Sequence, residues 1–440
     1  MRQTFPLLAA CSMIALSLCG AQFLGNHLLI LLCCGAFLLL MIGAACKETV
    51  FPLLLFFLPW ATLLKLSPDG KSFYSIALIL VCGILFLKRN LSLNALCLLS
   101  AIAIFALSIS SKLLDGEGIS FSYLMFLLML VLFPNMAAER SSFSVQTVFF
   151  SFGILLSALT AKFLADTGNI SAYITVHSGE GLLRYSGYYG DANFYSAHIS
   201  AAIAALLLMV LQEKNLNSCL RCALLILPLL YCGFLAASKA FLLTIMAVFV
   251  LWLLLILWKK PLLIRIAVLA ATTATALFIL SSGWMETLLF RLKIVSSFSE
   301  LTTGRTELWL DYLRSLLEEP KLFLLGVGLS ESKLHGFSAH NTILQSLYQL
   351  GLLGVFPLFT WLCTYLHSAL PKKWFRIFPQ AVMLGIGCFL PWMALDLLFF
   401  DEFFLLPLFW AAGCNYTLKG ESNNGTNPSN RPAGTAEHPV

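Results

Sequence analysis

The chain has 440 residues, of which 60% are hydrophobic and only 11% charged, and its mean hydropathy is +0.89. Soluble domains carry about 25% charged residues, so this composition excludes a soluble globular protein and indicates an all-α, polytopic bundle of membrane-spanning helices. The net charge of +6 implies no ligand class by itself, and no nucleic-acid partner is expected.

Apolar runs recur along the whole chain, and about 20 apolar residues cross a bilayer as a helix. Two of the runs are short for a full crossing, so 12 to 14 spanning helices are expected. The first run follows Met1-Arg2 and lacks the small-residue cleavage pattern of a signal peptide, so it is expected to remain as the first helix. The candidate helices are 5–24, 28–45, 49–64, 73–87, 91–110, 119–137, 143–165, 192–211, 220–237, 240–258, 262–281, 342–368, 376–396 and 402–418.

The larger polar segments divide the chain into three regions. Residues 1–165 hold N-terminal helices, and 166–418 hold helices with two long loops, 166–191 and 282–340. The tail 419–440 is rich in Asn, Gly, Pro and Ser and cannot bury enough apolar surface to fold, so we expect it to be disordered. Most of the 13 cysteines lie inside apolar runs, which does not suggest a disulfide framework.

Lysine and arginine predict the orientation, because they concentrate in cytoplasmic loops. With the N-terminus in the cytoplasm, fourteen of these residues fall at inner positions, against four at ordinary outer positions. The four are Lys65, Lys71, Lys112 and Lys162. Both termini are therefore expected in the cytoplasm, with both long loops outside.

The segment 281–341 is the longest polar stretch between apolar runs. From Thr306 to Glu319 apolar residues recur at helical spacing with charges on the other face, which predicts an amphipathic helix on the outer membrane surface or against the bundle. Pro320 ends this run. Ser338 or Asn341 is expected to cap the next spanning helix.

Two residues of this segment are candidates for chemistry. Arg305 follows Gly304 at the start of the predicted helix, where free N–H groups attract anions and a guanidinium fits phosphate. The alternative is a surface arginine paired with Glu307. His340 lies where the chain re-enters the bilayer, and an imidazole transfers protons near neutral pH. The alternative is an ordinary interfacial histidine, and His335 is more typical of a plain loop residue.

Upstream, Arg184 opens an aromatic and glycine-rich stretch that leads to Asp191 and Asn193 at the start of a predicted helix. Such residues suit sugar and phosphate contacts, or an aromatic belt at the membrane interface, and Asp191 also suits a helix cap. Lys239 lies in a short turn between apolar runs. A charge there needs a partner, a wet cavity or lipid headgroups.

Other polar residues are weaker candidates. His198 suits a hydrogen bond inside the bundle. The cluster of Asp396, Asp401 and Glu402 in the last outer loop either balances basic residues or binds a cation. Cys219-x-x-Cys222 has no second Cys or His pair, so no metal site is predicted there.

Taken in order, these motifs resemble the O-antigen ligase and polymerase family over about residues 180–400. The pattern of the polar loop and the next helix is similar in Gly304-Arg305, Gly326-Val327-Gly328, His340-Asn341, Leu344, Leu347 and Gly351-Leu352-Leu353-Gly354. The upstream R-x-x-G…D-x-N pattern is similar in Arg184, Gly187, Asp191 and Asn193.

The resemblance implies a multi-pass glycosyltransferase of the bacterial cytoplasmic membrane. It implies that a glycan passes from undecaprenyl diphosphate to lipid A core or to a growing glycan at the outer face, among membrane lipids. In this family Arg305 would bind the diphosphate, and His340 would act as a base or orient the acceptor hydroxyl. The other expected substrate-contacting residues are Arg184, Lys239, Asp191, Asn193 and Asn341.

One position departs from the family, which usually has Ser-Arg where this chain has Ser238-Lys239. Lysine keeps the charge but loses the bidentate phosphate contact. No cofactor or metal is expected, and the chain has no D-x-D motif. Ligase and polymerase both stay open, because acceptor choice depends on pocket shape. The other interpretations are a flippase or transporter of lipid-linked glycan, a peptidoglycan-type polymerase and a non-enzymatic scaffold.

Overall fold

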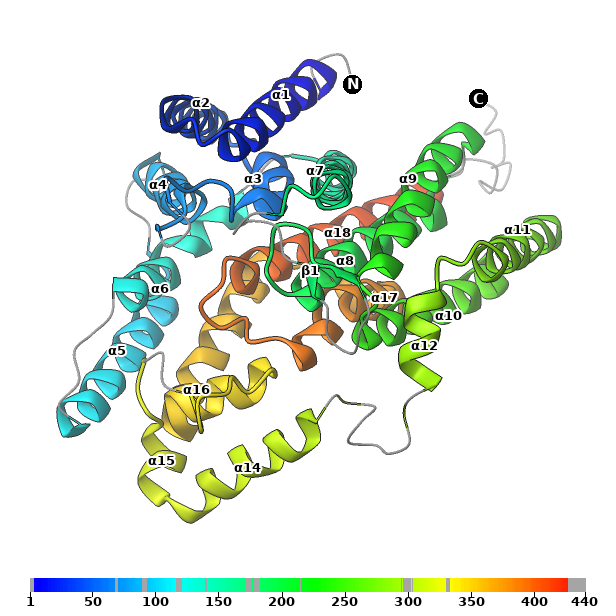
Figure 1. Ribbon diagram of the computed structural model, residues 1–440. Coiled ribbons are helices and arrows are strands. Elements are labelled where there is room, and N and C mark those ends of the chain that lie inside the picture. Colours follow the sequence, from blue (N-terminus) through cyan, green and yellow to red (C-terminus); the bar gives the residue numbers. More distant parts are fainter. Residues whose placement is uncertain are drawn as a thin grey trace, which may run out of the picture.

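The computed structural model is an all-α, polytopic membrane bundle (Figure 1). The structure describes residues 4–67, 70–88, 93–115, 121–138, 141–170, 176–177, 183–213, 215–293, 295, 302, 304–329 and 333–425.

Within these ranges nine helices are long and apolar enough to cross a membrane. They are α1 (Thr4–Phe23), α2 (His27–Cys46), α7 (Phe143–Asp166), α8 (Ala192–Gln212), α9 (Leu216–Leu235), α10 (Lys239–Lys259), α11 (Leu262–Ser281), α16 (Thr342–Ala369) and the continuous run of η4 (Trp374–Ile377), α17 (Phe378–Phe389) and η5 (Leu390–Ala394).

Four further apolar helices also belong to the bundle. They are α3 (Phe51–Phe57) with η1 (Leu58–Trp60), α4 (Phe73–Lys88), α5 (Ala95–Asp115) and α6 (Phe121–Leu132) with η2 (Phe133–Ala138). The last helix is α18 (Glu402–Gly425). The polar connections hold α12 (Glu286–Lys293), α14 (Arg305–Glu318), α15 (Pro320–Leu325) and the antiparallel strands β1 (Val176–His177) and β2 (Arg184–Tyr185).

Every apolar run predicted from the sequence coincides with a helix. The expected number of full crossings was 12 to 14, and nine are counted among the described residues, partly because α3, α4 and α6 are shorter than these nine helices. The tail also begins later than predicted, since α18 continues past Lys419 to Gly425, and 426–440 lie outside the described residues. All 13 cysteines are free thiols, as expected.

Helix α8 is the centre of the bundle, and it contacts α7, α9, α10, α17 and α18. Small side chains let neighbouring helices come close. For example, a Cβ built on Gly387 of α17 would lie only 2.3 Å from the Cβ of Ala204. This packing holds the start of α8, with Asp191 and Asn193, in a fixed place.

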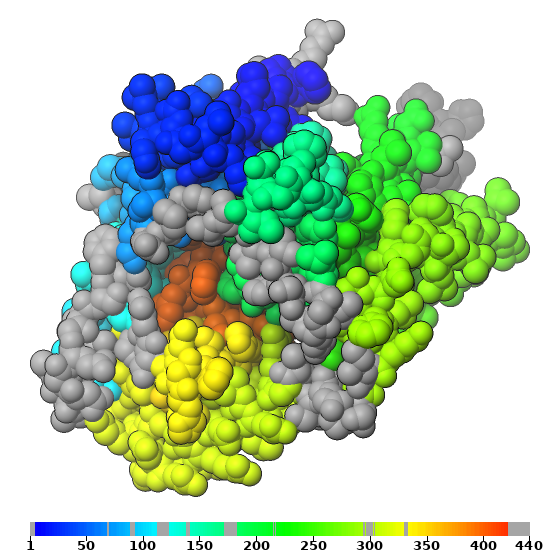
Figure 2. All heavy atoms as spheres, in the orientation of Figure 1, coloured from blue at the N-terminus to red at the C-terminus, as the bar shows by residue number. Residues whose placement is uncertain are grey.

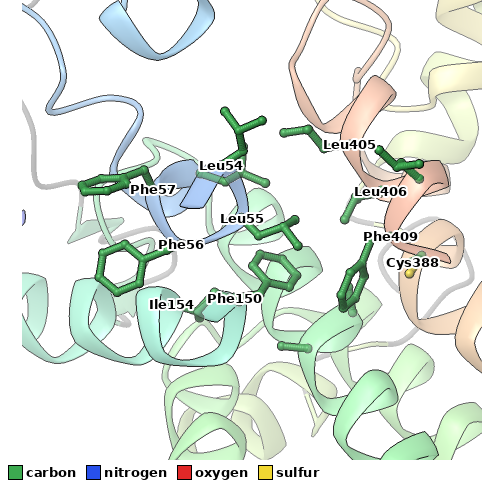
Figure 3. Packing of buried hydrophobic residues seen from close by; sticks show 14 of the residues in the cluster. Leu54, Leu55, Phe56, Phe57, Phe150, Ile154, Cys388, Leu405, Leu406 and Phe409 are labelled. Carbon is green, nitrogen blue, oxygen red and sulfur yellow. The ribbon is translucent and has the colours of Figure 1, made fainter. Parts of the chain in front are cut away.

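A second close approach joins α3 to α7. Figure 3 shows Phe56 of α3, Phe150 and Ile154 of α7, and Phe409 of α18 in one apolar cluster. A Cβ on Gly153 would lie 2.2 Å from the carbonyl oxygen of Phe56. Only a glycine therefore allows these two backbones to touch.

The predicted amphipathic helix is confirmed as α14, which ends at Glu318, and Pro320 begins the short helix α15. The sequence allowed two positions for this helix, on the outer membrane surface or against the bundle, and α14 lies against the bundle. Tyr312 and Leu316 pack with Tyr348 of α16. We call α14, α15 and residues 333–341 the polar cap; in Figure 1 it lies beside the start of α16.

Glycines of two motifs fix the polar cap on the bundle. Gly326 ends α15 with φ +67°, and Gly351 bends α16 with φ +62°. A Cβ on Gly326 would lie 2.5 Å from the backbone nitrogen of Gly351. The Val327 N–H donates to the Tyr348 carbonyl at 3.0 Å. The role of these two glycines in the structure is therefore to let two backbones meet.

Candidate functional site

The turn between α9 and α10 is the platform of the site. Arg184 Nε donates to the Ala236 carbonyl at 3.1 Å, and Arg291 Nη1 donates to the Ala237 carbonyl at 2.5 Å. The carbonyls at a helix C-terminus carry partial negative charge, which attracts cations. Ala237 has φ +46°. The end of α9 thus gathers two arginines that are far apart in sequence.

The starts of α8 and α10 lie at the same place. Asp191 caps α8 by accepting the Asn193 N–H at 2.6 Å. Ser238 caps α10, and its hydroxyl donates to Asn193 Oδ1 at 2.8 Å. The capping role considered for Asp191 is confirmed. Two helix N-termini therefore bring partial positive charge to this region, next to Lys239, the first residue of α10.

A pocket of about 490 Å³ opens over this platform. Four cationic side chains line it, and they come from four separate segments of the chain. They are Arg184, Lys239, Arg291 and Arg305. The polar lining also includes Asn193, Thr302 and Trp309, and the apolar lining includes Leu242, Leu243, Met246, Leu390 and Met393. We call this the cationic pocket. It suits an anion attached to a hydrocarbon chain.

Arg305 enters the pocket from the polar cap as the first residue of α14. The preceding Gly304 caps the helix with φ +75°, a conformation that glycine adopts without strain. Burial lowers the pKa of Arg305, and the nearby carboxylates of Asp191 and Asp396 oppose that change. An arginine stays charged in proteins, so the pocket holds a partly desolvated cation ready for an anion.

His340 faces Asp396, and it follows Ala339, whose carbonyl accepts a hydrogen bond from Trp309 of the pocket wall at 2.9 Å. Its backbone N–H donates to Asp396 Oδ2 at 3.0 Å, and Nδ1 lies 3.5 Å from the same oxygen. The His340 side chain is 40% exposed, so solvent or a substrate can reach it. With Nδ1 directed at the carboxylate, Nε2 is the nitrogen that accepts a proton.

The electrostatics favour a neutral imidazole. Burial lowers the pKa of His340 below the usual 6.5, and Arg305 acts in the same direction, whereas Asp396 and Asp191 raise it. Burial raises the pKa of the Asp396 carboxyl. His340, Arg305 and the N–H groups of His340 and Asn341 oppose that rise. A neutral base is what proton abstraction at neutral pH requires.

Asn341 holds this arrangement in place. Its side-chain oxygen accepts the N–H groups of Ile343 and Leu344 at 3.0 and 3.2 Å, so Asn341, and not Ser338, caps α16. His340 has φ +47°, a conformation that histidine and asparagine tolerate better than most residues. The capped helix start therefore fixes the imidazole beside Asp396.

The structure brings four of the predicted site residues into one pocket, adds Arg291 and places Asp396 beside His340. Arg184, Lys239, Asn193 and Arg305 line one pocket, and His340 is coupled electrostatically to Arg305. Arg291 was not predicted, because it lies in a short amphipathic stretch without a recognisable motif. Asp396 was grouped with Asp401 and Glu402, but only Asp396 pairs with His340.

The other candidates lie elsewhere. His198 Nε2 lies 3.0 Å from Glu402 Oε1, and both side chains are buried, which confirms a hydrogen bond inside the bundle. His335 is exposed in a turn with φ +52°. Among the side chains that the structure describes, no group of three or more His, Cys, Asp or Glu is placed to hold a metal ion. In comparisons with known proteins, no family model and no curated protein matches this chain.

Proposed function

We propose that this protein is a glycosyltransferase that moves a glycan from undecaprenyl diphosphate to a saccharide hydroxyl, as O-antigen ligases and polymerases do. The reaction takes place at the outer face of a bacterial cytoplasmic membrane. One observation carries the proposal. Four cations from separate segments share an apolar-walled pocket, beside an imidazole that faces a carboxylate.

The cationic pocket accounts for donor binding. The two phosphates of the donor contact Arg184, Lys239, Arg291 and Arg305, and its prenyl chain follows the apolar wall towards the lipid. Three of the four cations are arginines, which hold phosphate oxygens in pairs. They offset the single-point contact of Lys239, where the family usually has arginine.

The reaction follows from the positions of these groups. The acceptor hydroxyl oxygen attacks the anomeric carbon of the donor sugar and forms the new glycosidic bond. The bond from that carbon to the phosphate oxygen breaks, and undecaprenyl diphosphate leaves with the electron pair. The hydroxyl proton passes to Nε2 of His340, and Asp396 stabilises the resulting imidazolium. The arginines neutralise the charge that develops on the leaving group.

Two matched pairs of substitutions test this proposal in a strain that lacks its own copy of the gene. Arg305→Ala is compared with Arg314→Ala, since Arg314 lies on the same helix with its side chain 68% exposed. His340→Asn is compared with His335→Asn, because both histidines have positive φ and asparagine tolerates that conformation. Glycan profiles are recorded, and immunoblots of membrane fractions check protein levels.

We expect Arg305→Ala and His340→Asn to lower transfer by about 100-fold or more, while both controls keep it. Normal glycan with either variant would refute the proposal. A flippase would need the cations to hold its lipid-linked cargo but would need no base. Loss with Arg305→Ala and full function with His340→Asn would therefore favour transport.

A further inference from the structure

A second pocket, of about 580 Å³, lies beside the cationic pocket and shares no lining residue with it. Its lining comes from residues 58–79, 125–129, 189–194 and 399–404. In Figure 2 the orange C-terminal residues are recessed between the blue N-terminal part and the yellow residues near the start of α16. The cap of α8 joins the two pockets, because Asp191 lines the second and Asn193 the first.

The second pocket is also close to the proposed catalytic pair. Asp191 is near enough to His340 and Arg305 to influence the pKa of both. Asp396 and Asp401 lie on the same short connection between η5 and α18. Residues five apart in sequence are at most about 18 Å apart. The second pocket and the partner of His340 are therefore held on one short connection, with Asp191 between the pocket and His340.

Hydrogen bonds hold carboxylates in the wall of this pocket. Ser75 Oγ donates to Asp401 Oδ2 at 2.9 Å. The Tyr189 hydroxyl lies 3.0 Å from Glu402 Oε1, and His198 contacts the same oxygen. Burial, and next the charge of Glu402, raise the pKa of Asp401 to about 7, and the Ser75 hydrogen bond opposes this rise. A carboxyl group keeps acceptor positions in either protonation state, so the Asp401 side chain can accept hydroxyl groups from a ligand.

Aromatic rings line the same pocket. Tyr189 and Phe194 are stacked, with ring centroids 5.9 Å apart and planes inclined by 11°, and Phe400 lies 4.8 Å from Phe194. Phe400 is 45% exposed. Phe126, Phe399 and Phe404 complete this lining. A flat apolar ring next to a fixed carboxylate matches a sugar, which has an apolar C–H face and a rim of hydroxyl groups.

The charges disfavour other occupants. A purely hydrocarbon chain would leave the acceptor positions of Asp401 that Ser75 does not fill without a hydrogen-bond donor, which costs free energy. Lys65 and Lys71 line the pocket as well, so the pocket carries charges of both signs and does not suit a simple cation-binding site. A polyhydroxylated ligand is the chemistry that uses both the rings and the carboxylates.

We propose that this second pocket binds the terminal saccharide of the acceptor, so that donor and acceptor approach His340 from two pockets that meet at Asp191. The inference rests on the proposed function, but its test measures sugar binding and does not depend on glycan transfer. Phe400 supplies the stacking surface, and Asp401 accepts hydroxyl groups of the sugar.

Direct binding to the full-length protein in lipid nanodiscs tests the pocket. The probes are lipid-free core oligosaccharide in one arm and lipid-free glycan repeat in the other, which separates a ligase from a polymerase. We expect one probe to bind. Phe400→Ala should weaken that binding at least about fivefold, as loss of a stacking contact does. Asp401→Asn should weaken it too, because a neutral amide accepts hydroxyl groups less strongly than a carboxylate. Phe400→Leu keeps apolar volume without the flat ring and is expected to weaken binding as well.

Two controls complete the experiment. Phe356→Ala removes a ring that is 73% exposed on α16 and lines neither pocket, so it should leave sugar binding unchanged. Arg305→Ala should leave sugar binding unchanged but weaken binding of undecaprenyl diphosphate. Failure of both probes to bind, or equal binding by wild type and the two pocket variants, overturns the inference. Neither result affects the outcome of the transfer test with Arg305 and His340, so failure of this inference is distinguishable from failure of the proposed function.

Discussion

At the scale of single residues, the contact between His340 and Asp396 decides how the base works. One carboxylate oxygen lies near both the backbone N–H and Nδ1 of His340. The same group therefore fixes the main chain and orients the ring. In the proposed reaction, it would also stabilise the imidazolium that forms when His340 accepts a proton.

The substitution Asp396→Asn should change the pH profile in a defined direction. His340 must be neutral to act, and its pKa lies below 6.5, so the rate should fall only as the pH drops beneath that value. Asp396 raises the pKa of His340, so its removal should move this acid limb to still lower pH. The plateau rate should fall by about 10-fold to 100-fold, because the imidazolium loses its counter-charge.

The measurement is kcat/KM for glycan transfer from pH 5 to pH 8.5. Asp311→Asn is the matched control, since Asp311 lies on the polar cap and its side chain is 48% exposed. An acid limb that stays in place, or moves upward, in Asp396→Asn would rule out this role for the carboxylate.

Several site residues were predictable one by one from the sequence, and others were not. Arg305, His340 and Arg184 were found because each stands in a polar or glycine-rich motif beside an apolar run. Arg291 has no such context, and it becomes part of the site only because α12 packs against the end of α9. Asp396 was not separable from Asp401, since only the fold directs one to His340 and the other to the second pocket.

At the scale of elements, the apolar runs determine the helices, and glycines determine how closely they pack. Run length and composition were sufficient to place most helices within a few residues, whereas α18 continues from its predicted end at 418 to Gly425. The contact of α3 with α7 was not predictable, because hydropathy does not report which backbones touch. Gly153 and Phe56 meet through atoms that lie far apart in the sequence.

Gly153→Ala should therefore destabilise the bundle. The new Cβ would lie 2.2 Å from the Phe56 carbonyl oxygen, so α3 or α7 must shift, at about 1–3 kcal/mol. Gly83→Ala is the control, because a Cβ at that helical glycine meets nothing within 4 Å. The midpoint of thermal unfolding in detergent is measured for both variants. An equal midpoint for Gly153→Ala and Gly83→Ala would contradict the close packing.

At the scale of the whole molecule, the site and a set of lysines lie at opposite ends of the same helices. Helices α8, α10 and α16 begin at the site, as their caps show. Helix α10 ends at Lys259, and α16 ends shortly before Lys372 and Lys373. A helix of this length is about 30 Å long, roughly the thickness of the apolar part of a membrane.

This polarity predicts the topology, because lysines concentrate on the cytoplasmic side and the site then faces outward. Alkaline phosphatase inserted between His335 and Gly336, in an exposed turn of the polar cap, should be active, since the enzyme matures only outside the cytoplasm. The same insertion between Lys372 and Lys373 should be inactive, and a fluorescent protein fused after Val440 should fluoresce.

The reverse pattern would place the cationic pocket in the cytoplasm and would be incompatible with a donor displayed at the outer face. Active phosphatase at both positions would contradict the passage of α16 through the membrane, so the experiment tests the fold and the side of the site together.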